Sequence, residues 1–188
     1  MPTFDDQEFR GETYSKTSLP KGDYENCKFF HCVFANADLK GINFIDCEFN
    51  HCDLTMVKLS ATSLKTASFK GCKLLGVNFG DCNTFLMVLK FEECLLNLAS
   101  FYKLKLKNTI FKKCTLHEVD FTDTDLTAAS FDDSDLKGAT FENTLLGKAD
   151  LRTASNFSID PEINFIKKAK FSREGILGLL DKYDITIE

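Results

Sequence analysis

Large apolar residues recur every five residues along most of the chain. They occupy every fifth position through residues 24–79 and then, in a register displaced by two residues, through residues 86–151. In the second register Leu and Phe alternate strictly as far as Leu146. The residue two before each of these large residues is small or apolar, as Cys27 is before Phe29, and the remaining positions are mostly polar.

This period fits neither a helix nor an ordinary strand. A helix would repeat its apolar positions every 3.6 residues and a half-buried strand every two. Residues two apart on an extended segment point to the same side, so the small residue and the large residue of each unit both face inward. The chain must then turn once per unit, which predicts a coil whose side chains fill the inside of a tube.

Units such as Ala37-Asp38-Leu39-Lys40-Gly41 match the A(D/N)LXX consensus, and residues 22–153 resemble the pentapeptide repeat family throughout. The resemblance implies an all-β fold, a right-handed quadrilateral β-helix with four units per coil, so residues 20 apart should stack. The stacks expected on this basis are Cys32, Cys52 and Cys72; Leu86, Leu106, Leu126 and Leu146, opposite Leu96, Leu116 and Leu136; and Phe101, Phe121 and Phe141, facing Phe91, Phe111 and Phe131.

Three segments depart from the regular repeat. Residues 1–21 fit the period poorly and are predicted to be an N-terminal cap, because the terminal coils of a solenoid need atypical ends. Residues 154–188 are predicted to be a C-terminal cap and dimerisation segment, with an α-helix over 172–183, Ser172 as its N-cap, and a short strand over 184–188. The register break at 80–85 contains two extra residues and forms either a loop that carries function or a kink between two half-rods. The orientation of Cys82 within it stays open. The other residues of the break are Gly80, Asp81, Asn83, Thr84 and Phe85.

Eight cysteines and three histidines raise the question of metal or redox chemistry. Seven of the cysteines fall on inward small positions, where a free thiol acts as a small buried hydrophobe. His31, His51 and His117 fall on outward positions with no Ser, Cys or Asp partner beside them in the sequence. We therefore expect no enzyme, no cofactor and no metal site, and keep a thiol-based redox or metal enzyme as a minor alternative.

Charge directs attention to the outer surface. The net charge of −5, the absence of a long apolar run and the acidic start of the chain predict a cytoplasmic protein that binds neither nucleic acid directly nor a membrane. Lysines dominate residues 103–113, and acids dominate residues 118–150 at about one net charge per Å of rod axis, a density comparable to that of duplex DNA. Either this acidic stretch is a docking surface and partial DNA mimic or it only keeps the protein soluble. Its candidate residues are Glu118, Asp120, Asp123, Asp125, Asp132, Asp133, Asp135 and Glu142.

Two segments carry a narrower resemblance. Residues 91–96, with Cys94 three residues after Phe91, resemble a segment of the quinolone-resistance (Qnr) group, and residues 159–164 resemble the approach to the C-terminal helix of the microcin-immunity type. Such proteins bind DNA gyrase and topoisomerase IV, protect them from poisons, and dimerise through the C-terminal region. Qnr proteins use projecting loops, and without a long insertion this chain is closer to the immunity type.

The resemblance implies a homodimer and a topoisomerase partner. The dimer candidates are Ile176, Leu179, Leu180 and Tyr183, with packing of the predicted helix on its own last coil as the alternative. A general protein-interaction scaffold with another partner is the alternative function.

Overall fold

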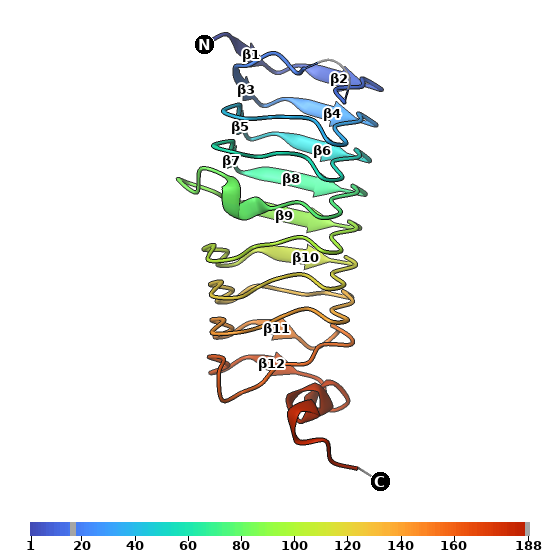
Figure 1. Ribbon diagram of the computed structural model, residues 1–188, viewed down its shortest axis with the longest axis vertical. Coiled ribbons are helices and arrows are strands. Elements are labelled where there is room, and N and C mark those ends of the chain that lie inside the picture. The colour runs from blue at the N-terminus through green and yellow to red at the C-terminus, as the bar shows by residue number, and fades with distance from the viewer. Residues whose placement is uncertain (16–17, 187–188) are drawn as a thin grey trace.

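The computed structural model of the protein describes residues 1–15 and 18–186 and shows a four-sided parallel β-solenoid (Figure 1). The N- and C-termini lie at opposite ends of the rod. Its strands are β1 (Thr3–Asp5), β2 (Glu8–Arg10), β3 (Asp23–Glu25), β4 (Lys28–Phe30), β5 (Asn43–Ile45), β6 (Glu48–Asn50), β7 (Ser63–Lys65), β8 (Ala67–Lys70), β9 (Leu89–Glu92), β10 (Ile110–Lys112), β11 (Asp150–Leu151) and β12 (Lys170–Phe171). Three short 3₁₀ helices complete it: η1 (Phe79–Asp81), η2 (Gly175–Leu179) and η3 (Asp181–Tyr183).

The strands stack at the 20-residue spacing expected from the repeat. We number the four faces of the rod in chain order. Face 1 carries the parallel sheet β1-β3-β5-β7, and face 2 carries β2-β4-β6-β8-β9-β10 and, further along, β11-β12. Faces 3 and 4 are joined by single parallel bridges, such as Val33 to Asp53 on face 3 and Asp38 to Lys58 on face 4.

Stacked aromatic rings fill the tube. Phe111 stacks on Phe91 on face 2 at a centroid distance of 5.3 Å, and Phe121 stacks on Phe101 on face 4 at 5.4 Å. The two ladders meet edge to face, with 5.8 Å between Phe101 and Phe111. Offset and edge-to-face pairs of this kind contribute about 0.5–1.5 kcal/mol each beyond their buried area. The expected Phe ladders are confirmed.

The chain turns once per unit at a residue with positive φ. On face 3, for example, Asn36 has φ 60° and the amide of Ala37 donates to the carbonyl of Phe34, which is a type II turn. A turn in each unit explains why the apolar period is five: one outward residue lies between the two inward residues of a unit, and two outward residues separate successive inward pairs.

The solenoid extends beyond both ends of the sequence repeat. At the N-terminus β1 and β2 pair in register with β3 and β4, and the ring of Phe4 stacks 4.6 Å from that of Tyr24. Residues 3–15, which lie in the segment predicted to be the N-terminal cap, therefore continue the coil. At the other end β12 pairs with β11 well past residue 153.

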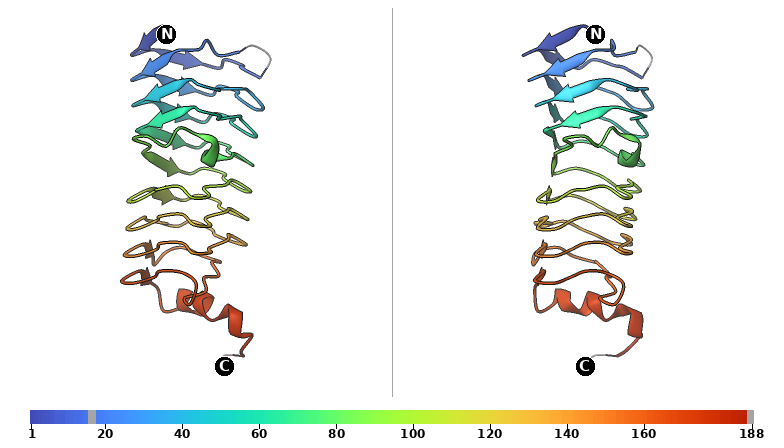
Figure 2. Two further views of the ribbon diagram at one scale, coloured as in Figure 1. Left: turned by 60° about the vertical axis from the view of Figure 1, so that its left-hand side comes forward. Right: turned by 90° about the vertical axis from the view of Figure 1, so that its left-hand side faces the viewer.

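The predicted C-terminal α-helix is wrong. Within residues 172–183 the only helices are η2 and η3, which pack beneath the last coil (Figure 2). Residues 184–186 do not form the predicted strand, and residues 187 and 188 lie outside the described part. Ser172 is not the N-cap of η2, which is Glu174, although the Ser172 Oγ accepts a hydrogen bond from the amide of Gly175 at 2.9 Å. Glycine lowers helix propensity by about 1 kcal/mol. Gly178 lies so close to the Phe157 carbonyl that a Cβ would overlap it. None of the helices in the described residues is long and apolar enough to cross a membrane.

Candidate binding surfaces

The eight cysteines lie inside the tube as free, buried thiols. Burial raises the pKa of Cys47 and of Cys82 to about 12, which keeps both thiols protonated at neutral pH. Cys82, whose orientation the sequence left open, is 7% exposed. Within residues 1–15 and 18–186, no three His, Cys, Asp or Glu side chains gather as a metal site would require.

The histidines lie on the outside, and one of them has an acidic partner. His31 and His51 stack with 5.3 Å between ring centroids, as their 20-residue spacing predicts. The expectation that His117 lacks a carboxylate partner is wrong, because its Nε2 lies 2.8 Å from Asp135 Oδ2 on the next coil. Burial raises the pKa of Asp135, but hydrogen bonds from Asn156 and His117 outweigh this effect and hold the pKa below its usual value.

The acids of residues 118–142 are distributed over all four faces. Asp125 lies on face 1 and pairs with Lys107 at 3.3 Å, and Asp135 lies on face 3. Asp132 and Asp133 directly follow Phe131 on face 2. The remaining four are on face 4 or at its edges: Glu118, Asp120, Asp123 and Glu142. No single face presents all eight candidates.

A more concentrated acidic surface lies at the N-terminal end of face 1, which the sequence analysis missed. It follows the sheet β1-β3-β5-β7, and we call it the acidic sheet; its members are Asp5, Asp6, Asp23, Glu25 and Asp46. The carboxylates of Asp5 and Asp23 accept hydrogen bonds from the amides of Asn26 and Asn43, at 3.1 and 2.5 Å. No lysine or arginine of the described chain forms an ion pair with any of the five. These acids lie within three coils, so their charges add on one flat face.

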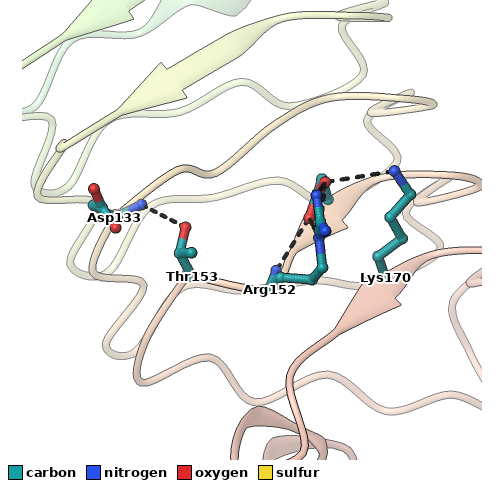
Figure 3. A network of polar contacts seen from close by, with 5 residues as sticks. Asp133, Arg152, Thr153 and Lys170 are labelled. Carbon is teal, nitrogen blue, oxygen red and sulfur yellow. Dashed lines mark hydrogen bonds and ion pairs between the residues drawn. The ribbon is translucent and has the colours of Figure 1, made fainter.

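Face 2 has the opposite character, because its charges pair from coil to coil. Glu92 lies 3.7 Å from Lys70 and 3.2 Å from Lys112, on the coils before and after it. Near the C-terminal end, Asp150 pairs with Arg152 at 2.7 Å and with Lys170 at 3.6 Å (Figure 3). The hydrogen bonds and charge of Arg152 lower the pKa of Asp150 to about 2.

The register break forms a projecting loop, but later in the chain than expected. Asn83 still bridges Ser63 at the regular spacing of 20, whereas Leu89 pairs with Ala67 at a spacing of 22, so the two extra residues lie within 84–88. Gly80 and Asp81 belong to η1 instead. The loop protrudes beside β7 and β9 in Figure 1.

Within this loop, the prediction that Leu86 joins the inward Leu ladder is wrong. Leu86 is 64% exposed and has φ 58°, whereas Leu106, Leu126 and Leu146 are buried as expected. Met87 packs against the core at this level, and the regular coil resumes on face 2, where Leu89 pairs with Ala67.

The dimer candidates lie at the C-terminal end. Ile176 and Tyr183 are each half exposed, whereas Leu179 packs against the core. Leu180 is half-buried. Leu177, which the sequence analysis did not select, is 47% exposed and adds to the apolar surface. Lys182 fixes the segment by binding both Asp160 and Glu162 at 2.7 Å.

The sequence model of one family, described as the pentapeptide repeat region, matches residues 22–101 and 84–151. No curated protein sequence matches the chain significantly. Among solved structures, a trypsin-treated form of QnrB1, a plasmid-mediated fluoroquinolone resistance protein, is 21% identical over the full length of both chains with a TM-score of 0.48. HetL, a pentapeptide repeat protein involved in heterocyst differentiation regulation in the cyanobacterium Nostoc sp. strain PCC 7120, is 19% identical over 92% of this chain and 88% of its own, with a TM-score of 0.40.

Proposed function

Because the chain belongs to the pentapeptide repeat family, we propose that it is a non-enzymatic binding protein that docks on DNA gyrase or topoisomerase IV and protects the enzyme from a toxin or a quinolone. The topoisomerase partner rests on the resemblance of residues 91–96 and 159–164 to the protecting proteins. In this proposal the protein acts in the cytoplasm, as a homodimer.

The observation that carries the proposal is the acidic sheet. An enzyme that binds DNA presents a positively charged surface to the phosphate backbone. Five carboxylates on one flat face, none paired with a lysine or arginine of the described chain, are available to such a surface. Their separation along the rod follows the strand spacing of about 4.8 Å, about 1.4 times the axial rise of 3.4 Å per phosphate of one DNA strand. The rod thus acts as a partial DNA mimic with a fixed shape.

Rigidity strengthens this mode of binding. The acidic sheet is backed by Tyr24 and Phe44, both fully buried, and its strands pair in a continuous register. Because the carboxylates are already held in place, docking orders few groups and loses little conformational entropy. A homodimer through the C-terminal segment would place two acidic sheets at the far ends of one longer assembly.

A general scaffold with a different basic partner is the second candidate. The acidic sheet would suit any protein with a complementary positive surface, because electrostatic attraction depends on the arrangement of charges and not on the identity of the partner. A pulldown from the native cell separates the two candidates, because topoisomerase subunits dominate the bound fraction only in the first.

A supercoiling assay tests the proposal directly. Gyrase inhibited by ciprofloxacin or by microcin is titrated with the purified chain, and the fraction of supercoiled plasmid is measured. We expect supercoiling to be restored in a concentration-dependent and salt-sensitive manner. Absence of both rescue and binding to gyrase would contradict the proposal.

A further inference from the structure

The loop at residues 84–88 projects large apolar side chains into solvent. Phe85 is 66% exposed, Leu86 64% and Val88 56%. We call these three residues the loop tip. Covering such apolar surface with another molecule lowers the free energy of the complex, and contiguous exposed apolar patches commonly mark interaction sites.

Lysines surround the loop tip. The Nζ of Lys65 lies 5.9 Å from the ring centroid of Phe85. Lys103 and Lys105 line a hollow of about 210 Å³ together with the base of the loop, and Lys90 lines a second hollow of about 380 Å³ beside Val88. We call Lys65, Lys90, Lys103 and Lys105 the lysine ring.

The lysine ring has no close ion pair within the described chain, although Asp123 and Glu92 act on Lys103 and Lys90 at longer range. None of its four ammonium groups has an ion-pair partner among the described residues. Of the acids in the neighbouring coils, Asp125 pairs with Lys107, Asp81 accepts a hydrogen bond from Asn78, and Asp46 and Glu48 line the same hollow as Lys90. Ammonium groups without a close ion pair around an exposed apolar tip suit an outside partner that supplies both negative charge and apolar surface.

We propose that the loop tip and the lysine ring bind an acidic segment of a partner protein, in which aromatic or aliphatic side chains alternate with carboxylates. The apolar side chains of the segment cover the loop tip, and its carboxylates pair with the lysine ring. This surface adjoins the acidic sheet, whose Asp46 lines the same hollow as Lys90 and Val88, but its own charge is opposite. The proposal goes beyond the proposed function and does not depend on it.

Charge also disfavours two other occupants. An anionic membrane that met face 1 at the loop tip would also approach the acidic sheet on the same face, which it repels. A second copy of the chain, related by a two-fold axis through the loop tip, would place one lysine ring near the other. A short acidic segment can cover the loop tip and the lysine ring without extending over the acidic sheet, and it brings no second lysine ring.

Fluorescence anisotropy with the full chain and a defined probe tests the proposal. The probe is a labelled 12-residue peptide that alternates Glu with Leu or Phe, and two control peptides replace either every Glu with Gln or every apolar residue with Ser. We expect the acidic apolar probe alone to bind, and more weakly as salt is raised. The variants Phe85→Ser with Leu86→Ser, and Lys103→Gln with Lys105→Gln, should each weaken binding by about tenfold or more.

The matched control is Lys40→Gln with Lys58→Gln, which removes the same charge from exposed positions on face 4. It should bind the probe like the unmodified chain. If the loop-tip variant fails to fold, the lysine variant decides the result alone, because its side chains are exposed. No binding of the probe, or equal binding by every variant, would overturn the proposal. Loop-dependent binding to phosphatidylserine vesicles, or a loop-dependent dimer in sedimentation, would reassign the surface and overturn it as well.

Discussion

The thiol of Cys72 donates a hydrogen bond to the carbonyl oxygen of Phe49 on the preceding coil, across 3.2 Å. The hydroxyl of Thr124 makes the same contact with the carbonyl of Phe101, at 2.8 Å. The small inward position of each unit therefore accepts Cys and Thr for one reason: both are compact and both can donate to a buried carbonyl. The cysteine content reflects packing and hydrogen bonding inside the tube.

This arrangement predicts that the native thiols resist labelling. All eight are buried, and at Cys47 and Cys82 burial also raises the pKa to about 12, so the reactive thiolate is scarce. We expect a thiol reagent to label none of them rapidly until the chain unfolds, with Cys82 first because it borders the loop. The control Ser60→Cys, at an exposed position, should react at once. Rapid labelling of several native thiols would support the redox alternative.

The aromatic ladder predicts a large stability effect at its centre. Phe111 stacks between Phe91 and Phe131, at 5.3 and 5.1 Å, and is fully buried. We expect Phe111→Ala to lower the free energy of unfolding by about 3–5 kcal/mol and Phe111→Leu to cost less, because Leu fills most of the cavity. Urea unfolding measures both. The exposed change Lys137→Gln should stay within about 0.5 kcal/mol, and an equally small loss for Phe111→Ala would contradict the ladder.

The sequence predicted the coil well because a single rule, the inward pair in every five residues, determines it. The same rule failed at Leu86, which fits the period as well as Leu106 does. Periodicity shows that two residues are extra but not which residues leave the tube. In the structure the bridge from Asn83 to Ser63 is kept, and Leu86 turns outward.

The structure of the C-terminal segment and the position of the acidic sheet were not predicted from the sequence, for other reasons. Ile176, Leu179 and Leu180 have the spacing of an α-helix, which is why a helix was predicted. The spacing of apolar residues carries no information about the close approach of Gly178 to Phe157. The acidic sheet was missed because charges were counted along the chain, whereas the solenoid places residues 20 apart side by side. Sorting acids by their position within the coil would have brought Asp6 and Asp46 to the same corner of face 1.

Acid should loosen the last coil. An unfolded aspartate titrates near pH 4, whereas the folded pKa of Asp150 is about 2 because Arg152 and Lys170 favour its charged form. The stabilising contribution is therefore fully present above pH 4 and is lost as the pH falls towards 2. Hydrogen exchange of the Lys170 amide, which donates to the Ala149 carbonyl, should report this loss. Asp150→Asn should remove this pH dependence and Glu142→Gln should keep it.

The exposed apolar residues of η2 predict a dimer that one substitution can break. Ile176 and Leu177 are about half exposed, so a charge there would be buried in the proposed interface but solvated in the monomer. We expect a dimer in light scattering for the unmodified chain and a monomer of unchanged thermal stability for Ile176→Glu. Met56→Glu is the matched control, because Met56 is 55% exposed on face 3, far from this end. A dimer that persists in Ile176→Glu would exclude this interface.

Two acidic surfaces can be distinguished by removing the same charge from each. One variant combines Asp5→Asn, Asp23→Asn, Glu25→Gln and Asp46→Asn, which neutralises most of the acidic sheet; Asn or Gln can still accept the hydrogen bonds from Asn26 and Asn43. The matched variant combines Asp120→Asn, Asp123→Asn, Asp132→Asn and Asp133→Asn, which lie on faces 2 and 4.

In the supercoiling assay, the first variant should need about tenfold more protein for rescue, because the charges that it removes act together on one flat face. The second variant should need less than about twice as much, because its charges point in different directions and cannot meet one surface together. The reverse order would place the docking surface in residues 118–142. An equal loss in both variants would mean that total charge, rather than the geometry of face 1, governs the encounter with the topoisomerase.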